Sequence, residues 1–181
     1  MPTITELSEL SGEYALDADR TRIGFVGKHS VGPRVRGTFE EFEGSAHLDG
    51  DNPAKSHVRL TLRAASLQTG KRMRDDPLRA KFLDAANHPV ITFTSTEVKQ
   101  VDGARFRVTG DLTLRGTTRP LTLDVESTGG ESDADGRLLA GFRGGATINR
   151  KDWGATANAV DTLIVSSQVT VEFEVVAVRQ P

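Results

Sequence analysis

The sequence predicts an all-β protein: a single antiparallel β-barrel of about eight strands, with one short helix near residues 76–84. Apolar and polar residues alternate with a period of two in several segments, which is typical of a sheet with one face in an apolar interior and the other in water. Short clusters of Gly, Asp, Asn and Pro separate these segments, as in consecutive hairpins. Many segments are long, and closure of the sheet removes the edges that long strands would otherwise expose.

The alternation and the turn signals place nine strand segments along the chain. We expect them at 13–17, 21–29, 34–48, 56–65, 89–98, 104–115, 120–128, 137–149 and 162–178. Turns are expected at 49–53, at 102–103, at 116–118 and from Gly129-Gly130 to Gly136. Ten residues share the phase that should face the barrel interior: Val58, Leu60, Leu62, Leu112, Leu114, Leu121, Leu123, Val169, Val171 and Phe173.

One of these segments changes phase along its length. Phe39 and Phe42 lie in opposite parities of segment 34–48. Both can face the interior only if a β-bulge lies near Glu40-Glu41, and barrels use such bulges to bend a strand around a corner.

The helix prediction depends on residues 75–89. Asp75 and Asp76 precede Pro77, and an acidic cap followed by proline in the first turn favours a helix start. Apolar residues then recur at helical spacing, at Leu78, Phe82 and Leu83, and 87–89 (Asn-His-Pro) ends the pattern.

The composition excludes several classes of function. The 181 residues fit one domain, and 23 basic against 25 acidic residues, a net charge of −2, give no reason to expect nucleic acid as a partner. Because the chain has no cysteine, disulfides, thiolate metal sites and cysteine nucleophiles are excluded.

The N-terminal residues resemble neither a signal peptide nor an anchor. Residues 1–10 (MPTITELSEL) contain two glutamates and no basic or strongly apolar region. No stretch approaches the ~20 apolar residues that span a bilayer. We therefore expect a cytoplasmic protein without a membrane span, with an N-terminal segment at 1–12 and a barrel domain at 13–181.

Few residues suggest catalysis or metal binding. The glycine-rich stretch 141–145 lies within a predicted strand and lacks the strand–loop–helix context of a phosphate-binding loop. The four histidines, His29, His47, His57 and His88, do not have the spacing of metal ligands, although His47 and His57 flank a turn and lie within reach across a hairpin. We predict no catalytic residue, no metal and no cofactor.

Polar residues at strand ends are candidates for contact with the polar part of a ligand. His29 shares the interior phase of Phe25, so it is either a hydrogen-bonded interior histidine or an anchor for a ligand head group. Arg150 follows a strand beside Asp152, and residues 71–81 carry five basic side chains. These groups are either solvated loops, with Arg150 paired to Asp152, or a charged rim that attracts an anionic or carbonyl head group.

Seven stretches, in their order and spacing, carry a resemblance to a known family. They are 22–25 (RIGF) with His29, 35–39 (VRGTF) with 42–44 (FEG), 65–69 (ASLQT), 77–79 (PLR) with 81–84 (KFLD), 88–95 (HPVITFTS), 110–116 (GDLTLRG) and 149–154 (NRKDWG). From about Glu13 to Val178 the chain resembles the YceI-like family of polyisoprenoid-binding proteins.

The resemblance implies a lipocalin-like barrel with a helix beside it, often a homodimer. It also implies an elongated pore that holds a polyprenyl chain, such as the tail of a quinone or of a polyprenyl phosphate, and it brings no established catalytic activity. Two features depart from the family. Many relatives are exported to the periplasm whereas this chain shows no signal, and Trp153 stands where many relatives carry Phe.

The alternation and the resemblance together predict a protein that binds a long apolar isoprenoid inside its barrel, for storage, transport or sensing. The expected apolar pore residues are Phe25, Val35, Phe39, Phe42, Leu60, Leu62, Phe93, Phe106, Leu112, Leu114, Leu121, Leu123, Phe142, Val171 and Phe173. The expected head-group residues at the mouth are His29, Arg150 and Trp153. Small residues of the predicted strands, Gly27, Gly37, Gly110, Gly141 and Ala146, suggest a continuous tunnel, since a missing side chain leaves room in a small barrel.

Two other functions fit the same sequence. A barrel of eight strands has little room, so its own side chains can fill it, and the protein would then be a stress-related or interaction protein without a ligand. An enzyme that acts on a lipophilic substrate would need an acid–base pair in the interior, where only His29 is expected.

Overall fold

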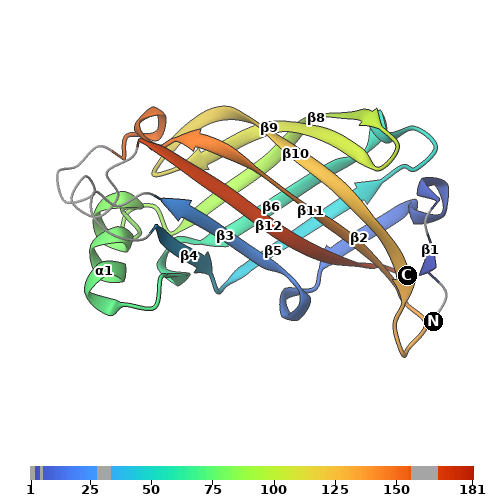
Figure 1. Ribbon diagram of the computed structural model, residues 1–181, viewed down its shortest axis with the longest axis horizontal. Coiled ribbons are helices and arrows are strands. Elements are labelled where there is room, and N and C mark those ends of the chain that lie inside the picture. The colour runs from blue at the N-terminus through green and yellow to red at the C-terminus, as the bar shows by residue number, and fades with distance from the viewer. Residues whose placement is uncertain (1–2, 5, 28–33, 156–166) are drawn as a thin grey trace.

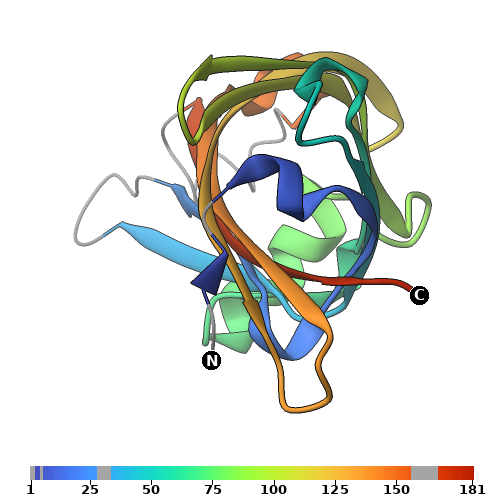
Figure 2. The ribbon, with the colours of Figure 1, turned by 90° about the vertical axis from the view of Figure 1, so that its right-hand side faces the viewer.

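The computed structural model describes residues 3–4, 6–27, 34–155 and 167–181. Eight antiparallel strands close into a ring in the order β2-β5-β6-β8-β9-β10-β11-β12, and β12 pairs back with β2 (Figure 1 and Figure 2). Their bounds are β2 Gly12–Leu16, β5 Phe42–Leu48, β6 His57–Arg63, β8 Val90–Asp102, β9 Arg105–Leu114, β10 Thr117–Ser132, β11 Leu138–Asn149 and β12 Gln168–Arg179. This closed ring confirms the predicted barrel.

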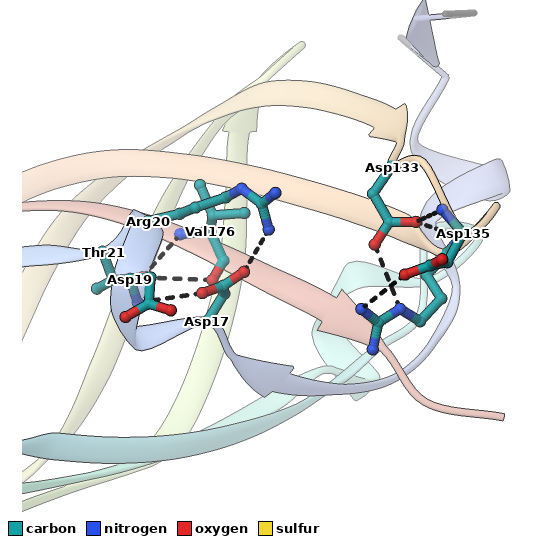
Figure 3. Close-up of polar contacts among 8 residues, drawn as sticks. Asp17, Asp19, Arg20, Thr21, Asp133, Asp135 and Val176 are labelled. Atoms are coloured by element: carbon teal, nitrogen blue, oxygen red, sulfur yellow. Dashed lines mark hydrogen bonds and ion pairs between the residues drawn. The ribbon is translucent and has the colours of Figure 1, made fainter.

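The first strand of the ring is built in two parts. After β2 the chain forms a 3-10 turn, η2 (Ala18–Arg20), and β3 (Arg22–Gly27) then continues along β12. The Asp17 N–H donates to the Val176 carbonyl oxygen at 2.8 Å, and Val176 N–H donates to Thr21 Oγ1 at 3.1 Å (Figure 3). The predicted strands 13–17 and 21–29 are therefore two halves of one strand, of which residues 28–29 lie outside the described ranges.

The second strand is also divided, where the alternation changes phase. β4 (Val35–Phe39) pairs with β3, and β5 pairs with β2. Between them, the Glu40 N–H donates to the Ser66 carbonyl oxygen at 3.1 Å and the Arg63 N–H donates to the Glu41 carbonyl oxygen at 2.9 Å. A short strand, β7 (Leu67–Gln68), extends the sheet beyond β4.

The inward face agrees with the period-two prediction. All ten residues expected to face the interior line the central cavity of the barrel. On the outer face of the same strands, opposite charges lie side by side, as in the ion pair between Arg143 Nη2 and Glu126 Oε1 at 3.0 Å.

The helix differs from its predicted bounds. α1 spans Arg72–Pro77 and continues into a π-helical turn, η5 (Leu78–Phe82). The helix therefore begins before Asp75-Asp76, and Pro77 stands at the end of α1 rather than in its first turn. Asp75 is buried and its carboxylate accepts from the Thr69 N–H at 2.8 Å, so it holds the chain that enters the helix.

The turn predicted from Gly129-Gly130 is shorter than expected. β10 continues through both glycines, with a register shift between Ser127 and Gly129, and Gly130 pairs with Ala140. The reversal lies at residues 133–137, where Asp133 accepts from the N–H groups of Asp135 and Arg137, each at 2.9 Å (Figure 3). The hydrogen bond from the Arg137 N–H is the main reason that the pKa of Asp133 is lowered.

The two ends of the barrel are covered differently (Figure 1). The end that we call the closed end holds both termini, the strand β1 (Thr3–Ile4), the 3-10 turns η1 (Leu7–Leu10) and η3 (Pro53–Lys55), and the turn at 133–137. The opposite end, the helix end, holds α1, η5 and the 3-10 turns η4 (Ala64–Ser66) and η6 (Arg150–Trp153). No helix in the described part of the chain is long and apolar enough to cross a membrane.

Candidate ligand-binding site

An apolar cavity of about 300 Å³ runs through the interior of the barrel. At the closed end its wall includes Leu7 and Leu10, and at the helix end it includes Leu78, Phe82 and Leu83. Between them the wall is formed by inward side chains of the barrel strands. A cavity of this size with an apolar wall is typical of a site for a small apolar ligand.

Thirteen of the fifteen expected pore residues lie on this cavity wall. They are Phe25, Phe39, Leu60, Leu62, Phe93, Phe106, Leu112, Leu114, Leu121, Leu123, Phe142, Val171 and Phe173. The other two are not on the wall. Val35 is buried, and Phe42 is partly buried against the hydrophobic cluster at the helix end, on the same face of the sheet as its cross-strand partner Leu62.

Two strand glycines, Gly37 and Gly110, lie against aromatic rings of the cavity wall. A Cβ atom at Gly37 would lie 2.4 Å from Cζ of Phe25, and one at Gly110 would lie 2.6 Å from Cζ of Phe93. These glycines therefore make room for aromatic rings. An apolar cavity is present, and at Gly37 and Gly110 the missing side chains leave room for rings that line it. The continuous tunnel remains a prediction.

The N-terminal segment covers the closed end. In Figure 2, which views this end, the coil of η1 crosses the mouth of the barrel. Leu10 is buried against Leu138 and Ala140, and its carbonyl oxygen accepts from the Tyr14 hydroxyl at 2.7 Å. Burial raises the pKa of Tyr14, while the charge of Arg179 acts in the opposite direction.

The backbone of η1 fits closely against the turn between β5 and β6. The Gly50 N–H donates to Ser11 Oγ at 2.9 Å, and a Cβ atom at Gly50 would lie only 1.7 Å from the Leu7 carbonyl oxygen. Only glycine therefore fits at this contact. The sequence signals for this cover were weak, because Leu7 and Leu10 are the main apolar residues of an acidic segment.

The helix end is covered by α1 and η5. Arg74 donates to Thr69 Oγ1 at 2.7 Å and to the Thr69 carbonyl oxygen at 3.0 Å, and the Thr69 hydroxyl donates to Asp75. Arg79 Nε donates to the Leu67 carbonyl oxygen at 2.7 Å. These contacts orient the helix so that its apolar residues face the cavity. Two of the five basic residues at 71–81 thus have structural roles.

The expected head-group residues are not brought together on the cavity wall. His29 lies outside the described residues. Arg150 is 0 % exposed, and its guanidinium donates to the Ala155 carbonyl oxygen, which holds the η6 turn. Trp153 is buried in the hydrophobic cluster at the helix end, and its Nε1 donates to the Leu112 carbonyl oxygen at 3.0 Å.

His47 and His57 meet across the β5–β6 hairpin, as their spacing suggested. Their rings stack with centroids 5.2 Å apart, and His47 Nδ1 lies 2.5 Å from Glu13 Oε1. Glu13 and much of His47 are exposed, so this histidine–carboxylate pair lies on the outside of the barrel. Within the described ranges, no group of three or more His, Asp or Glu side chains is placed to hold a metal ion.

The comparisons with known proteins agree with this geometry. Residues 14–177 match the YceI-like domain. The chain is 38% identical to a UPF0312 protein of Pectobacterium carotovorum over 176 residues, covering 96% of this chain and 90% of the relative. It is 36% identical to the protein YceI of Escherichia coli over 166 residues, covering 87% of this chain and 86% of the relative.

Solved structures share the fold. BcnA of Burkholderia cenocepacia superposes with a TM-score of 0.79 at 26% identity, covering 89% of this chain and 98% of BcnA. A polyisoprenoid-binding domain from Saccharophagus degradans superposes with a TM-score of 0.69 at 19% identity, covering 92% of this chain and 98% of that domain. At this low sequence identity the likeness shows a shared fold and nothing more. With nearly all of its barrel matched in sequence and in fold, the chain belongs to the YceI-like family.

Proposed function

We propose that residues 13–181 form a barrel that binds one long isoprenoid chain, of the polyprenyl quinone or polyprenyl phosphate type, for storage, transport or sensing. The observation that carries the proposal is the apolar cavity that extends between Leu10 at the closed end and Leu78 at the helix end. Burial of each apolar carbon of such a chain contributes about 0.8 kcal/mol. A long tail can therefore bind tightly without polar contacts.

The comparisons and the cavity favour this function over the two alternatives. The description of the Saccharophagus degradans domain as polyisoprenoid-binding supports a lipid ligand. A barrel filled completely by its own side chains would not retain a cavity of about 300 Å³. An enzyme would need an acid–base pair beside the substrate, whereas the hydrogen-bonded pair of His47 and Glu13 lies on the outside.

The direct test is mass spectrometry of organic extracts from gently purified protein, followed by titration with the lipid that is found. Leu112→Trp should fill the middle of the cavity, which Leu112 lines. We expect affinity for a long isoprenoid to fall about tenfold, because excluding only two CH₂ groups of the tail costs about 1.6 kcal/mol.

Asp111→Trp is the matched control, since Asp111 is the neighbouring residue on the exposed face of the same strand. It should leave binding unchanged. Equal affinity of the Leu112 variant and the wild type would contradict a ligand in the cavity.

The head-group contacts of His29, Arg150 and Trp153, the cytoplasmic location and the homodimer remain predictions. The buried position of Arg150 supports a role in holding the η6 turn near the mouth. Cell fractionation tests the location, and light scattering of the purified protein tests the dimer.

A further inference from the structure

The most exposed large apolar residue in the described part of the chain lies on α1. Met73 is 91 % exposed, and the only comparable residue there, Val101, is 45 % exposed next to the end of β8. In Figure 1 β8 ends on the side of the barrel that holds both termini. Single exposed apolar residues are common on protein surfaces. The position of Met73 is informative because the same helical stretch contributes Leu78 and Phe82 to the cavity wall.

Exposed basic side chains lie on the same helical stretch as Met73, together with the exposed carboxylate of Asp76. Lys71, Arg72 and Lys81 are all exposed. Lys71 and Lys81 have no ion pair with any residue that the structure describes, and Arg72 has only an exposed pair with Asp76 at 3.5 Å. An exposed apolar side chain among cations matches the chemistry of an interfacial lipid-binding surface.

Charge is distributed unequally between the two ends of the barrel. At the helix end, residues 71–84 hold five cations and three carboxylates, and the β9–β10 turn at 115–119 adds two arginines and no carboxylate. At the closed end, residues 6–13 hold three carboxylates and no cation, and residues 131–137 hold three carboxylates and one arginine. A negatively charged surface would therefore attract the helix end and repel the closed end.

We propose that the helix end docks on an anionic lipid bilayer, with Met73 entering the interface and Lys71, Arg72 and Lys81 facing the lipid head groups. The bilayer is the occupant that fits both the apolar tip and the surrounding charge. Docking in this orientation places the covered mouth at α1 and η5 against the membrane. The surface is separate from the cavity, so docking does not depend on which ligand the cavity binds.

A single fluorophore can test the contact directly. The chain has no cysteine, so Met73→Cys gives one attachment site for an environment-sensitive dye such as NBD. We expect a blue shift and a rise in intensity on addition of vesicles with equal parts of phosphatidylcholine and phosphatidylglycerol, and no change with phosphatidylcholine alone. The dye at Val101→Cys, on the opposite end, should not respond to either vesicle.

Charge variants test the electrostatic part by vesicle co-sedimentation. The double variant Lys71→Glu, Lys81→Glu should bind anionic vesicles at least about twentyfold less well than the wild type, because each cation near the surface contributes about fivefold. Lys55→Glu with Lys99→Glu makes the same change in net charge at exposed positions elsewhere and should bind like the wild type.

Three outcomes would overturn the proposal. They are equal binding to neutral and anionic vesicles, an equal dye response at positions 73 and 101, and equal losses in the two double variants. Absence of vesicle binding by the wild type would also overturn it, while leaving isoprenoid binding in the cavity intact.

Discussion

The closed end and the helix end cover the same cavity with different kinds of contact. At the closed end, η1 is fixed by the burial of Leu10, by the Tyr14 hydroxyl and by a backbone fit at Gly50 that leaves no room for a Cβ atom. At the helix end, the cover is a short helix held by the burial of Leu78 and Leu83 and by the polar contacts of Thr69 and Asp75. The closed end thus adds a close backbone fit, whereas the contacts that hold the helix end come from side chains.

The difference between the two covers indicates at which end of the barrel a ligand enters and leaves. The end with the tighter backbone fit also carries the acidic segments, and the end with the short helix carries the cations and Met73. Ligand exchange is therefore expected at the helix end. Three predictions test the contrast, beginning with the largest expected effect.

Leucine truncation at each end should show that the two covers are independent. Leu10→Ala and Leu78→Ala each remove a fully buried side chain and should each lower the free energy of unfolding by about 2–5 kcal/mol. Hydrogen exchange should rise around residues 7–11 in the first variant and around residues 72–83 in the second. If either variant increased exchange equally at both ends, the distinction between the ends would fail.

The buried carboxylate of Asp75 should matter more than the exposed carboxylate beside it. Asp75→Asn weakens the hydrogen bonds from Thr69 and should cost about 1–2 kcal/mol in thermal unfolding. The control, Asp76→Asn, loses only exposed pairs with Arg72 and Arg79, at 3.5 and 3.8 Å, and should cost less than about 0.5 kcal/mol. Equal costs would mean that α1 is not held through Asp75.

Alkaline pH should loosen the closed end through Tyr14. Its pKa is raised, mainly by burial, so the folded protein favours the neutral phenol. This contribution is fully present below the unfolded pKa of about 10 and is lost as the pH rises through the higher folded value. Tyr14→Phe should lose about 0.5–1.5 kcal/mol at neutral pH, because the bond to the Leu10 carbonyl oxygen is absent.

Urea unfolding of both proteins between neutral and alkaline pH provides the comparison. The wild type should lose stability more steeply above pH 10 than the Tyr14→Phe variant, which has no tyrosine left to ionise. Parallel curves would show that another group causes the alkaline loss.

The sequence predicted the barrel wall well because the wall depends on a simple pattern. In β6, β9 and β12 one face meets the cavity and the other meets water, so residues such as Leu60, Leu112 and Val171 alternate strictly with polar neighbours. The phase of each strand then determines which side chains can reach a ligand.

The covers at the two ends were harder to predict because they depend on tertiary contacts. Nothing local marks Leu10 as buried or Gly50 as the point where η1 contacts the β5–β6 turn. The order Asp75-Asp76-Pro77 is typical of a helix start. In the structure, however, the buried carboxylate of Asp75 accepts a hydrogen bond from the N–H of Thr69, which precedes the helix. Arg150, charged and at a strand end, was expected at the mouth, yet its bond to the Ala155 carbonyl allows complete burial.

The closure of the ring has a consequence for how the protein folds. Leu16 pairs with Ala177, so the first and last strands meet only after the whole chain is available. Contacts at such sequence separation form slowly, and until they form, the sheet has two open edges that can pair with other chains. On the first strand, η2 at Ala18–Arg20 divides that edge into β2 and β3. The interruption leaves shorter templates for aggregation during the slow step, and it thereby favours closure of the chain on itself.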